Sequence, residues 1–212
     1  MENTTPLTAF VHRFVPAQDA QAPTLLLLHG TGGSETDLLS VGPMLMPGAA
    51  LLSPRGRVLE HGVESRFFRR LAEGVFDVED LRYRTHELAG FVRAASEEYH
   101  FDPTRVVAVG YSNGANIAAS MFLLRPEILK GALLLRPMVP FVPEQAPDLS
   151  EKAIFISSGR NDPIVPSASP TQLEQILQQA GAQVTLNWQN GGHALSHEDI
   201  REGRLWLQKH SL

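Results

Sequence analysis

Cysteine is absent from this chain of 212 residues. Its absence excludes disulfide bonds, cysteine nucleophiles and thiolate metal sites. It also excludes a small secreted scaffold held together by disulfides, although it says nothing more about the cellular compartment. No cluster of His, Asp and Glu has the spacing of metal ligands, so we expect neither a metal nor another cofactor.

Long apolar runs and an excess of basic residues are also missing. No run approaches the length of a membrane span, and residues 1–6 have neither the basic nor the apolar region of a signal peptide. The net charge of −5, from 18 basic and 23 acidic residues, argues against nucleic acid or an anionic membrane as the main partner. We therefore expect a cytoplasmic protein without membrane insertion.

Hydrophobic residues make up 43% of the chain, which is enough apolar surface for a sizeable core. The length suggests one domain over residues 1–212. Apolar runs alternate with helix-like segments, which predicts an α/β fold with a mostly parallel central sheet and helices on both faces. The expected strands are 8–15, 24–28, 49–52, 105–109, 131–135, 153–156 and 183–188. In such sheets, ligands bind outside the carboxyl ends of the strands.

The central motif of the sequence is G-x-S-x-G at residues 110–114. An apolar run at 105–109 precedes it and a helix-like run at 115–124 follows it, which predicts strand, sharp turn and helix. A serine at such a turn is held in a strained conformation with its hydroxyl exposed above the sheet edge. The alternative is a plain turn whose serine caps the helix. We favour Ser112 as a nucleophile because of the strand before it and the helix after it.

A serine nucleophile needs a base, and histidine suits that role because its ordinary pKa lies near neutral pH. Of the eight histidines, His193 is best placed, since it follows the last expected strand in a glycine-flanked loop. His197, at the start of the final helix, is the competitor and is expected to be solvated. His29 precedes a glycine loop and is expected to be structural.

The base in turn needs an acid that orients it. Asp162 follows the expected strand at 153–156, and Pro163 makes its turn rigid. The order Ser112, Asp162, His193 is the one that a G-x-S-x-G hydrolase requires. An Asx turn is the alternative role for Asp162, and Asp148, in a proline-rich loop, is the alternative acid.

Two backbone N–H groups must receive the negative charge that develops on the substrate oxygen. We expect one from Asn113, the residue after the nucleophile, and one from Thr31 in the loop at 29–33. A phosphate-binding loop is the competing interpretation of 29–33. That loop lacks the third spaced glycine of a dinucleotide fingerprint and a Gly-Lys-Ser/Thr sequence, so we treat a nucleotide site as disfavoured.

The most basic patch of the chain is residues 66–70, which include Phe67 and Phe68. One interpretation is a solvated surface with both phenylalanines packed inward. The other is part of a cap over the site, with the phenylalanines lining an apolar substrate pocket. The two interpretations stay open from the sequence, and we add Met138 and Val139 to the candidate pocket residues.

With these motifs in place, the sequence resembles the α/β-hydrolase superfamily, and within it the phospholipase/carboxylesterase family that includes the acyl-protein thioesterases. The matching segments are 27–33, 110–114, 162–166 and 192–193. It looks most like small bacterial carboxylesterases found with quinone- and hydroquinone-resistance genes, and the segments that suggest this are 53–56, 66–70, 110–119 and 136–140. The resemblance implies a cofactor-independent ester or thioester hydrolase. Acyl-protein thioesterases usually have Gln where Asn113 stands, so a lipidated-protein substrate does not transfer.

The sequence therefore predicts a serine hydrolase that cleaves small to medium carboxylic esters through an acyl-serine intermediate. A thioesterase or lysophospholipase, and a non-catalytic protein that binds a small ligand, are the alternatives. Dienelactone hydrolases typically carry a cysteine nucleophile, which disfavours that branch. The close succession of sheet elements predicts a minimal lid or none, with residues 57–76 leaving Ser112 open. The expected partner is a small-molecule ester, and a homodimer is left open.

Overall fold

The computed structural model describes residues 5–19, 21–210 and 212. Its central element is a seven-stranded sheet within these residues, in the order β1-β3-β2-β8-β9-β10-β11. The edge strand β1 runs antiparallel to β3, and the other strands pair in parallel, which confirms the predicted mostly parallel sheet. The strands of the sheet are β1 (His12–Val15), β2 (Thr24–Leu28), β3 (Ala50–Pro54), β8 (Val106–Tyr111), β9 (Gly131–Leu135), β10 (Ala153–Gly159) and β11 (Gln183–Gln189).

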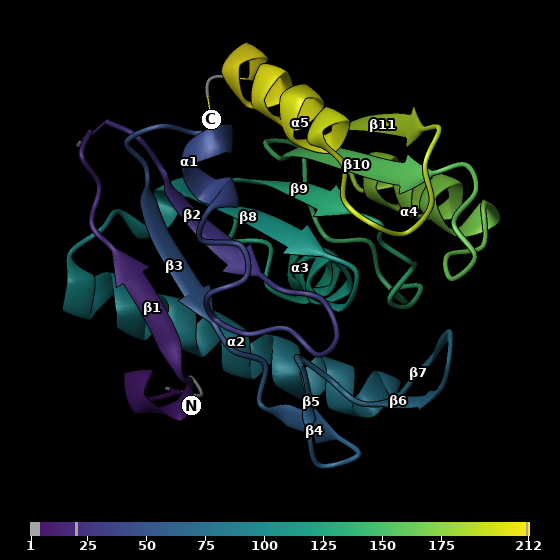
Figure 1. The fold of residues 1–212 in the computed structure, drawn as a ribbon, viewed down its shortest axis with the longest axis horizontal. Helices are drawn as coiled ribbons and strands as arrows, with labels where there is room; N and C mark the ends of the chain where they lie inside the picture. The colour runs from purple at the N-terminus through teal and green to yellow at the C-terminus, as the bar shows by residue number, and fades with distance from the viewer. Residues whose placement is uncertain (1–4, 20, 211) are drawn as a thin grey trace.

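Helices cover both faces of this sheet, with α1 and α5 on one side and α2, α3 and α4 on the other (Figure 1). The helices are α1 (Val41–Leu45), α2 (Val78–Tyr99), α3 (Asn113–Leu124), α4 (Ala168–Gln179) and α5 (His197–Lys209), with short 3-10 turns η1 (Leu7–Ala9) and η2 (Pro103–Arg105). The segment after β3 forms two hairpins beside the sheet, made of β4 (Val58–Glu60), β5 (Glu64–Arg66), β6 (Arg70–Ala72) and β7 (Val75–Phe76).

The inner strands are buried on both faces, which explains why they are continuous apolar runs. In β2, Leu26 and Leu28 pack into the core under α2, α3 and α4, whereas Leu25 and Leu27 pack into the core under α1 and α5. Successive side chains of a strand point to opposite faces, so one run of leucines serves both cores. The two cores hold the strands rigidly, and their carboxyl ends meet along one edge.

Local signals in the sequence set several helix boundaries. Asp77 caps α2 by accepting from the Asp80 backbone N–H, and His100, with φ of 58°, ends the helix in the left-handed conformation. Ser196 and Asp199 form a capping box at the start of α5. The helix α4 begins at Ala168, and the Ser169 hydroxyl accepts from the Val139 N–H at 2.9 Å.

Candidate active site

Ser112 lies at the turn between β8 and α3 and is partly exposed. Its φ of 52° and ψ of −112° are unusual for a residue with a side chain, and such conformations cost about 1–3 kcal/mol. The flanking glycines are required by space: a Cβ on Gly110 would lie 2.6 Å from the Gly114 carbonyl oxygen, and one on Gly114 would lie 2.1 Å from that of Leu28. The Ser112 N–H donates to the Leu135 carbonyl at 2.9 Å, which ties the turn to β9.

His193 and Asp162 lie within hydrogen-bond distance of this serine and of one another. The Nε2 atom of His193 lies 3.0 Å from the Ser112 hydroxyl oxygen, and Nδ1 lies 2.8 Å from Oδ2 of Asp162. The Asp162 side chain is 1% exposed and that of His193 is 16% exposed. A buried carboxylate that accepts the Nδ1 proton leaves Nε2 free to accept a proton from the serine. The structure therefore brings together the three residues that the sequence selects.

The Asp162 carboxylate forms an Asx turn with one oxygen and contacts His193 with the other. Its Oδ1 accepts from the backbone N–H groups of Ile164 at 2.8 Å and Val165 at 3.0 Å, which is the Asx turn. Its Oδ2 is then fixed in place facing the histidine. Asp148, the competing acid, is exposed and accepts from the Ser150 backbone N–H.

The two competing histidines have other surroundings. His29 is buried, its Nδ1 donates to the Gly30 carbonyl at 2.6 Å, and its Nε2 accepts from the Gly56 N–H at 2.9 Å. Burial lowers the pKa of His29, which keeps the ring neutral and able to accept at Nε2. His197 is exposed at the first position of α5. His29 is thus structural and His197 solvated, as expected.

Thr31, in the loop after β2, and Asn113, at the start of α3, are the residues whose backbone N–H groups the sequence predicts as oxyanion donors. Asn113 is the first residue of α3, so its N–H has no acceptor inside the helix. Among the described residues, neither the Thr31 nor the Asn113 N–H donates a hydrogen bond. The side chains of both residues are anchored: Arg66 donates to the Thr31 hydroxyl at 2.7 Å, and the Asn113 amide oxygen accepts from the Phe67 N–H at 2.7 Å.

The sequence of the chain matches the model of the Dienelactone hydrolase family over residues 73–203. The chain belongs to the dienelactone hydrolase family. It is 48% identical to MhqD of Bacillus subtilis strain 168 over 185 residues, which are 87% of this chain and 92% of that protein. The sequence analysis argued against the dienelactone hydrolases because the chain lacks their usual cysteine nucleophile, and this prediction is wrong. The nucleophile is a single position, whereas the family match extends over a segment that includes Ser112, Asp162 and His193.

Solved structures of similar proteins share the fold of this dienelactone hydrolase family member. A carboxylesterase from Bacillus cereus superposes with a TM-score of 0.93 at 48% identity and covers 95% of this chain and 94% of its own. A carboxylesterase from Mesorhizobium loti gives a TM-score of 0.86 at 30% identity and covers 94% of this chain and 95% of its own. The α/β-hydrolase fold and the similarity to bacterial carboxylesterases are thus confirmed.

The hairpins of residues 58–76 brace the site in this family member instead of covering it. Within the described residues no lid is evident, and Ser112 keeps solvent access. Of the two interpretations of residues 66–70, inward packing of Phe67 and Phe68 is confirmed. A solvated side chain is wrong for Arg66, which is 4% exposed and pairs with Glu60 at 3.2 Å. The pocket prediction is also wrong for Phe67 and Phe68, which are 2% and 0% exposed and lie in the hydrophobic core. The ring of Phe67 packs against His29, and that of Phe68 packs against Phe76.

The remaining pocket candidates are half-buried on the loop after β9. The Met138 N–H donates to the Asn116 amide oxygen at 2.7 Å, and the Val139 N–H donates to the Ser169 hydroxyl at 2.9 Å. Both side chains are partly exposed on a loop whose backbone is held by α3 and α4. A role of Met138 and Val139 in a substrate pocket stays a prediction.

Sequence reasoning missed one prominent residue, Arg136, which follows β9 directly. Its side chain is 1% exposed and forms an ion pair with the fully buried Asp199 at 2.8 Å. It also donates to backbone carbonyls in the loop that carries His193. From the sequence, an arginine after a strand is expected at the surface. The only sequence feature that pointed to Arg136 was the segment 136–140, which carries part of the family resemblance.

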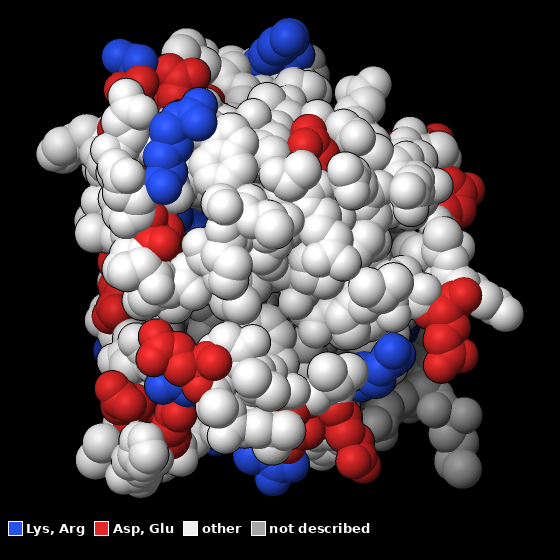
Figure 2. Space-filling model, turned by 90° about the vertical axis from the view of Figure 1, so that its right-hand side faces the viewer, with Lys and Arg blue, Asp and Glu red and all other residues white. Residues whose placement is uncertain are grey.

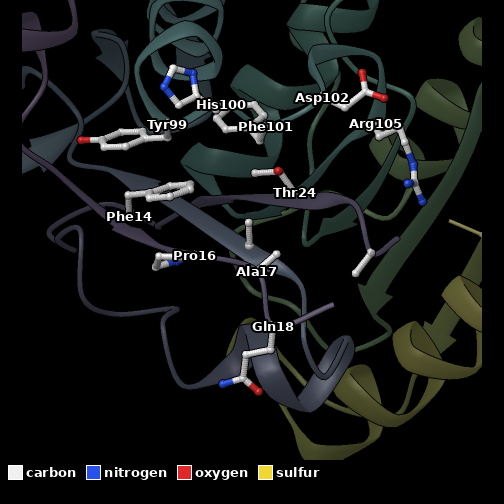
Figure 3. Close-up of a pocket in the computed structure, with 12 residues that line it drawn as sticks. Phe14, Pro16, Ala17, Gln18, Thr24, Tyr99, His100, Phe101, Asp102 and Arg105 are labelled. Carbon is white, nitrogen blue, oxygen red and sulfur yellow. The ribbon is translucent and has the colours of Figure 1, made fainter. Parts of the chain in front are cut away.

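Other parts of the described chain lack a comparable constellation. No group of three or more His, Asp or Glu among the described residues lies close enough to hold a metal ion. None of their helices is both long and apolar enough to cross a membrane. A pocket of about 370 Å³, lined by Phe14, Thr24, Tyr99 and Arg105 among others, lies at the amino ends of the parallel strands (Figure 3). That is the edge of the sheet opposite to Ser112.

Proposed function

We propose that this protein is a carboxylesterase that cleaves small to medium carboxylic esters through an acyl-serine intermediate. One observation carries the proposal: a serine with strained backbone, a histidine 3.0 Å from its hydroxyl and a buried carboxylate 2.8 Å from the other ring nitrogen. This arrangement activates a hydroxyl that is otherwise a weak nucleophile. The carboxylesterases of Bacillus cereus and Mesorhizobium loti support the reaction class.

In the first half of the proposed reaction, the Ser112 oxygen attacks the ester carbonyl carbon while its proton moves to Nε2 of His193. The carbonyl oxygen becomes negatively charged and accepts from the N–H groups of Thr31 and Asn113. Asp162 stabilises the imidazolium through Nδ1 and keeps its carboxylate charge. The bond to the alcohol oxygen then breaks, and His193 returns the proton to that oxygen, which releases the alcohol.

The second half repeats these steps with water. His193 takes a proton from water, whose oxygen attacks the acyl carbon, and the same two N–H groups receive the oxyanion. The bond to Ser112 breaks, the proton passes back to the serine oxygen, and the carboxylic acid leaves. The ester, one water and the side chains of Ser112 and His193 account for every proton and bond in this reaction.

The surface around the site supports an uncharged substrate. The carboxyl ends of β8, β9, β10 and β11 point to the right in Figure 1, and Figure 2 views the molecule from that side. Charged side chains lie mostly toward the edges of this face, and uncharged atoms fill most of its middle (Figure 2). A charged substrate would lose its strong hydration on binding to such a surface, whereas an uncharged ester would not.

The proposal is tested by hydrolysis of p-nitrophenyl esters of increasing acyl length, together with an acyl thioester and a lysophospholipid. We expect turnover of short and medium esters, and its loss in a Ser112→Ala variant that keeps the thermal midpoint of unfolding. If kcat/KM is higher for the thioester or the lysophospholipid than for the p-nitrophenyl esters, that compound class replaces carboxylic esters as the proposed substrate. No Ser112-dependent hydrolysis of any member, combined with tight binding of an intact ester, would instead favour a ligand-binding protein.

A further inference from the structure

The buried guanidinium of Arg136 lies next to the loop of His193. Arg136 is the first residue after β9, and its φ of 58° places it in the left-handed region that residues with side chains rarely adopt. Its own N–H donates to the Ser157 carbonyl on β10 at 2.7 Å. A backbone conformation of this kind costs free energy, so the surrounding contacts must hold it in place.

The guanidinium donates to the two peptide carbonyls that flank the histidine. Its Nε donates to the Gly192 carbonyl at 2.9 Å, and an Nη2 proton goes to the Ala194 carbonyl at 3.2 Å. The carbonyl between them, that of His193 itself, accepts from the Tyr111 hydroxyl at 3.2 Å. Three successive carbonyls of this loop are therefore fixed by side chains that come from the ends of β8 and β9.

A buried carboxylate balances the charge of the arginine and holds the far side of the same loop. Asp199 accepts from Nη1 and Nη2 of Arg136 at 2.8 and 2.9 Å, and from the Ser157 hydroxyl at 2.5 Å. It also accepts from the N–H and the hydroxyl of Ser196, both at 2.8 Å. Burial alone would raise the pKa of the Asp199 carboxyl, but these hydrogen bonds outweigh burial and the pKa is lowered. Asp199 is thus a carboxylate at neutral pH.

The position of Arg136 in the sheet links the strands that carry the three reacting side chains. β9 lies between β8, which ends at the nucleophile, and β10, which leads to the acid. The Ser112 N–H bonds the carbonyl of Leu135, one residue before Arg136. One side chain therefore ties the loop of His193 to the strand against which the nucleophile turn is fixed. An apolar residue of the same size could fill the space but could not hold these carbonyls.

We propose that Arg136, paired with Asp199, is a positioning residue that sets the distance between His193 Nε2 and the Ser112 hydroxyl. The proposal rests on the function proposed above for this site. A histidine displaced by about 1 Å no longer accepts the serine proton efficiently, and displacements of that size lower rates by about 100-fold. The guanidinium acts through the loop backbone and touches neither substrate nor reacting atoms.

The test is an Arg136→Lys variant assayed with p-nitrophenyl acetate. Lysine keeps the charge next to Asp199 but cannot reach the Gly192 and Ala194 carbonyls and both carboxylate oxygens at once. We expect kcat to fall by about 100-fold while KM stays within about threefold, since substrate contacts are unchanged. Arg84→Lys is the matched control, because Arg84 pairs with two carboxylates on α2, those of Asp80 and Glu87, and should keep kcat.

A second readout does not depend on hydrolysis. The proton between His193 Nδ1 and Asp162 should give a far-downfield NMR signal, identified by its absence in a His193→Ala variant. We expect that signal to broaden or shift in the Arg136→Lys protein and to stay in place in the Arg84→Lys protein. Wild-type protein without Ser112-dependent hydrolysis, but with this NMR response, would overturn the proposed function and leave the positioning role supported.

A double variant covers the case in which Arg136→Lys does not fold. Arg136→Met with Asp199→Leu removes both buried charges together, and such replacements are often neutral or stabilising. We expect it to fold with kcat lowered by about 100-fold or more, because the loop carbonyls lose their donors. Wild-type kcat and an unchanged NMR signal in either folded variant would overturn the positioning role.

Discussion

Replacing Asp162 with asparagine tests how the acid holds the histidine, because the structure dictates which way the new amide must point. Oδ1 of Asp162 accepts from the backbone N–H groups of Ile164 and Val165. The asparagine amide must offer its oxygen to these two donors, which places its NH₂ group toward His193. Nδ1 of the histidine must then become an acceptor, so Nε2 carries the proton and can no longer accept one from Ser112.

The size of the effect follows from this change of tautomer. A triad whose histidine is held in the wrong tautomer loses about 10⁴-fold in kcat, which corresponds to about 5 kcal/mol of activation free energy. The Asx turn survives in Asp162→Asn with a neutral acceptor in place of a charged one, so the free energy of unfolding should fall by only about 1 kcal/mol. The activity loss and the stability loss are thus expected to differ severalfold in free energy.

The assay compares kcat for p-nitrophenyl acetate and the urea unfolding midpoint of both proteins. Asp148→Asn is the matched control, since Asp148 is exposed and accepts from the Ser150 N–H in a similar turn. It should leave kcat unchanged. A loss of less than about tenfold in kcat for Asp162→Asn would refute the tautomer argument, because a one-decade change needs only a small distortion of the site.

Further predictions concern the residues around the triad. Asn113→Ala should lower stability by about 1–3 kcal/mol, because the buried Phe67 N–H loses its acceptor; kcat measured on the folded variant should change by less than about tenfold, since the backbone donor at position 113 stays. His29 should make the free energy of unfolding fall as the pH drops below about 6.5, because the unfolded chain binds a proton that burial keeps off the folded ring. That loss should level off below the lowered pKa of the folded state. Denaturant unfolding at several pH values should show a flatter slope in His29→Gln, whose amide oxygen can still accept from the Gly56 N–H; an unchanged slope would contradict the assignment.

The sequence predicted the parts of the site that depend on neighbouring residues. The turn at Ser112, the loop of Asp162 and the loop of His193 each follow an expected strand, and parallel strands bring such loops to one edge. The alternation of strands and helices predicted a mostly parallel sheet, but not the order of its strands. The Asx turn of Asp162, offered as an alternative, is likewise a local pattern.

The parts that sequence reasoning missed depend on contacts between distant segments. Arg136 and Asp199 are separated by 63 residues, and only the folded sheet brings them together. The strands of the hairpins at 58–76 span two or three residues each, which is too short to show the alternation of a strand. Phe67 and Phe68 were therefore open to two interpretations until the core was seen to enclose them.

The central claim is that Ser112 is the nucleophile and that His193 activates it. Fluorophosphonate labelling followed by peptide mass spectrometry tests it most directly, because the probe bonds only an activated serine oxygen. We predict one adduct on Ser112 in the wild-type protein, none in Ser112→Ala and slow labelling in His193→Ala, with all three proteins folded. An adduct on another residue, or labelling of Ser112 at the wild-type rate without His193, would contradict the account.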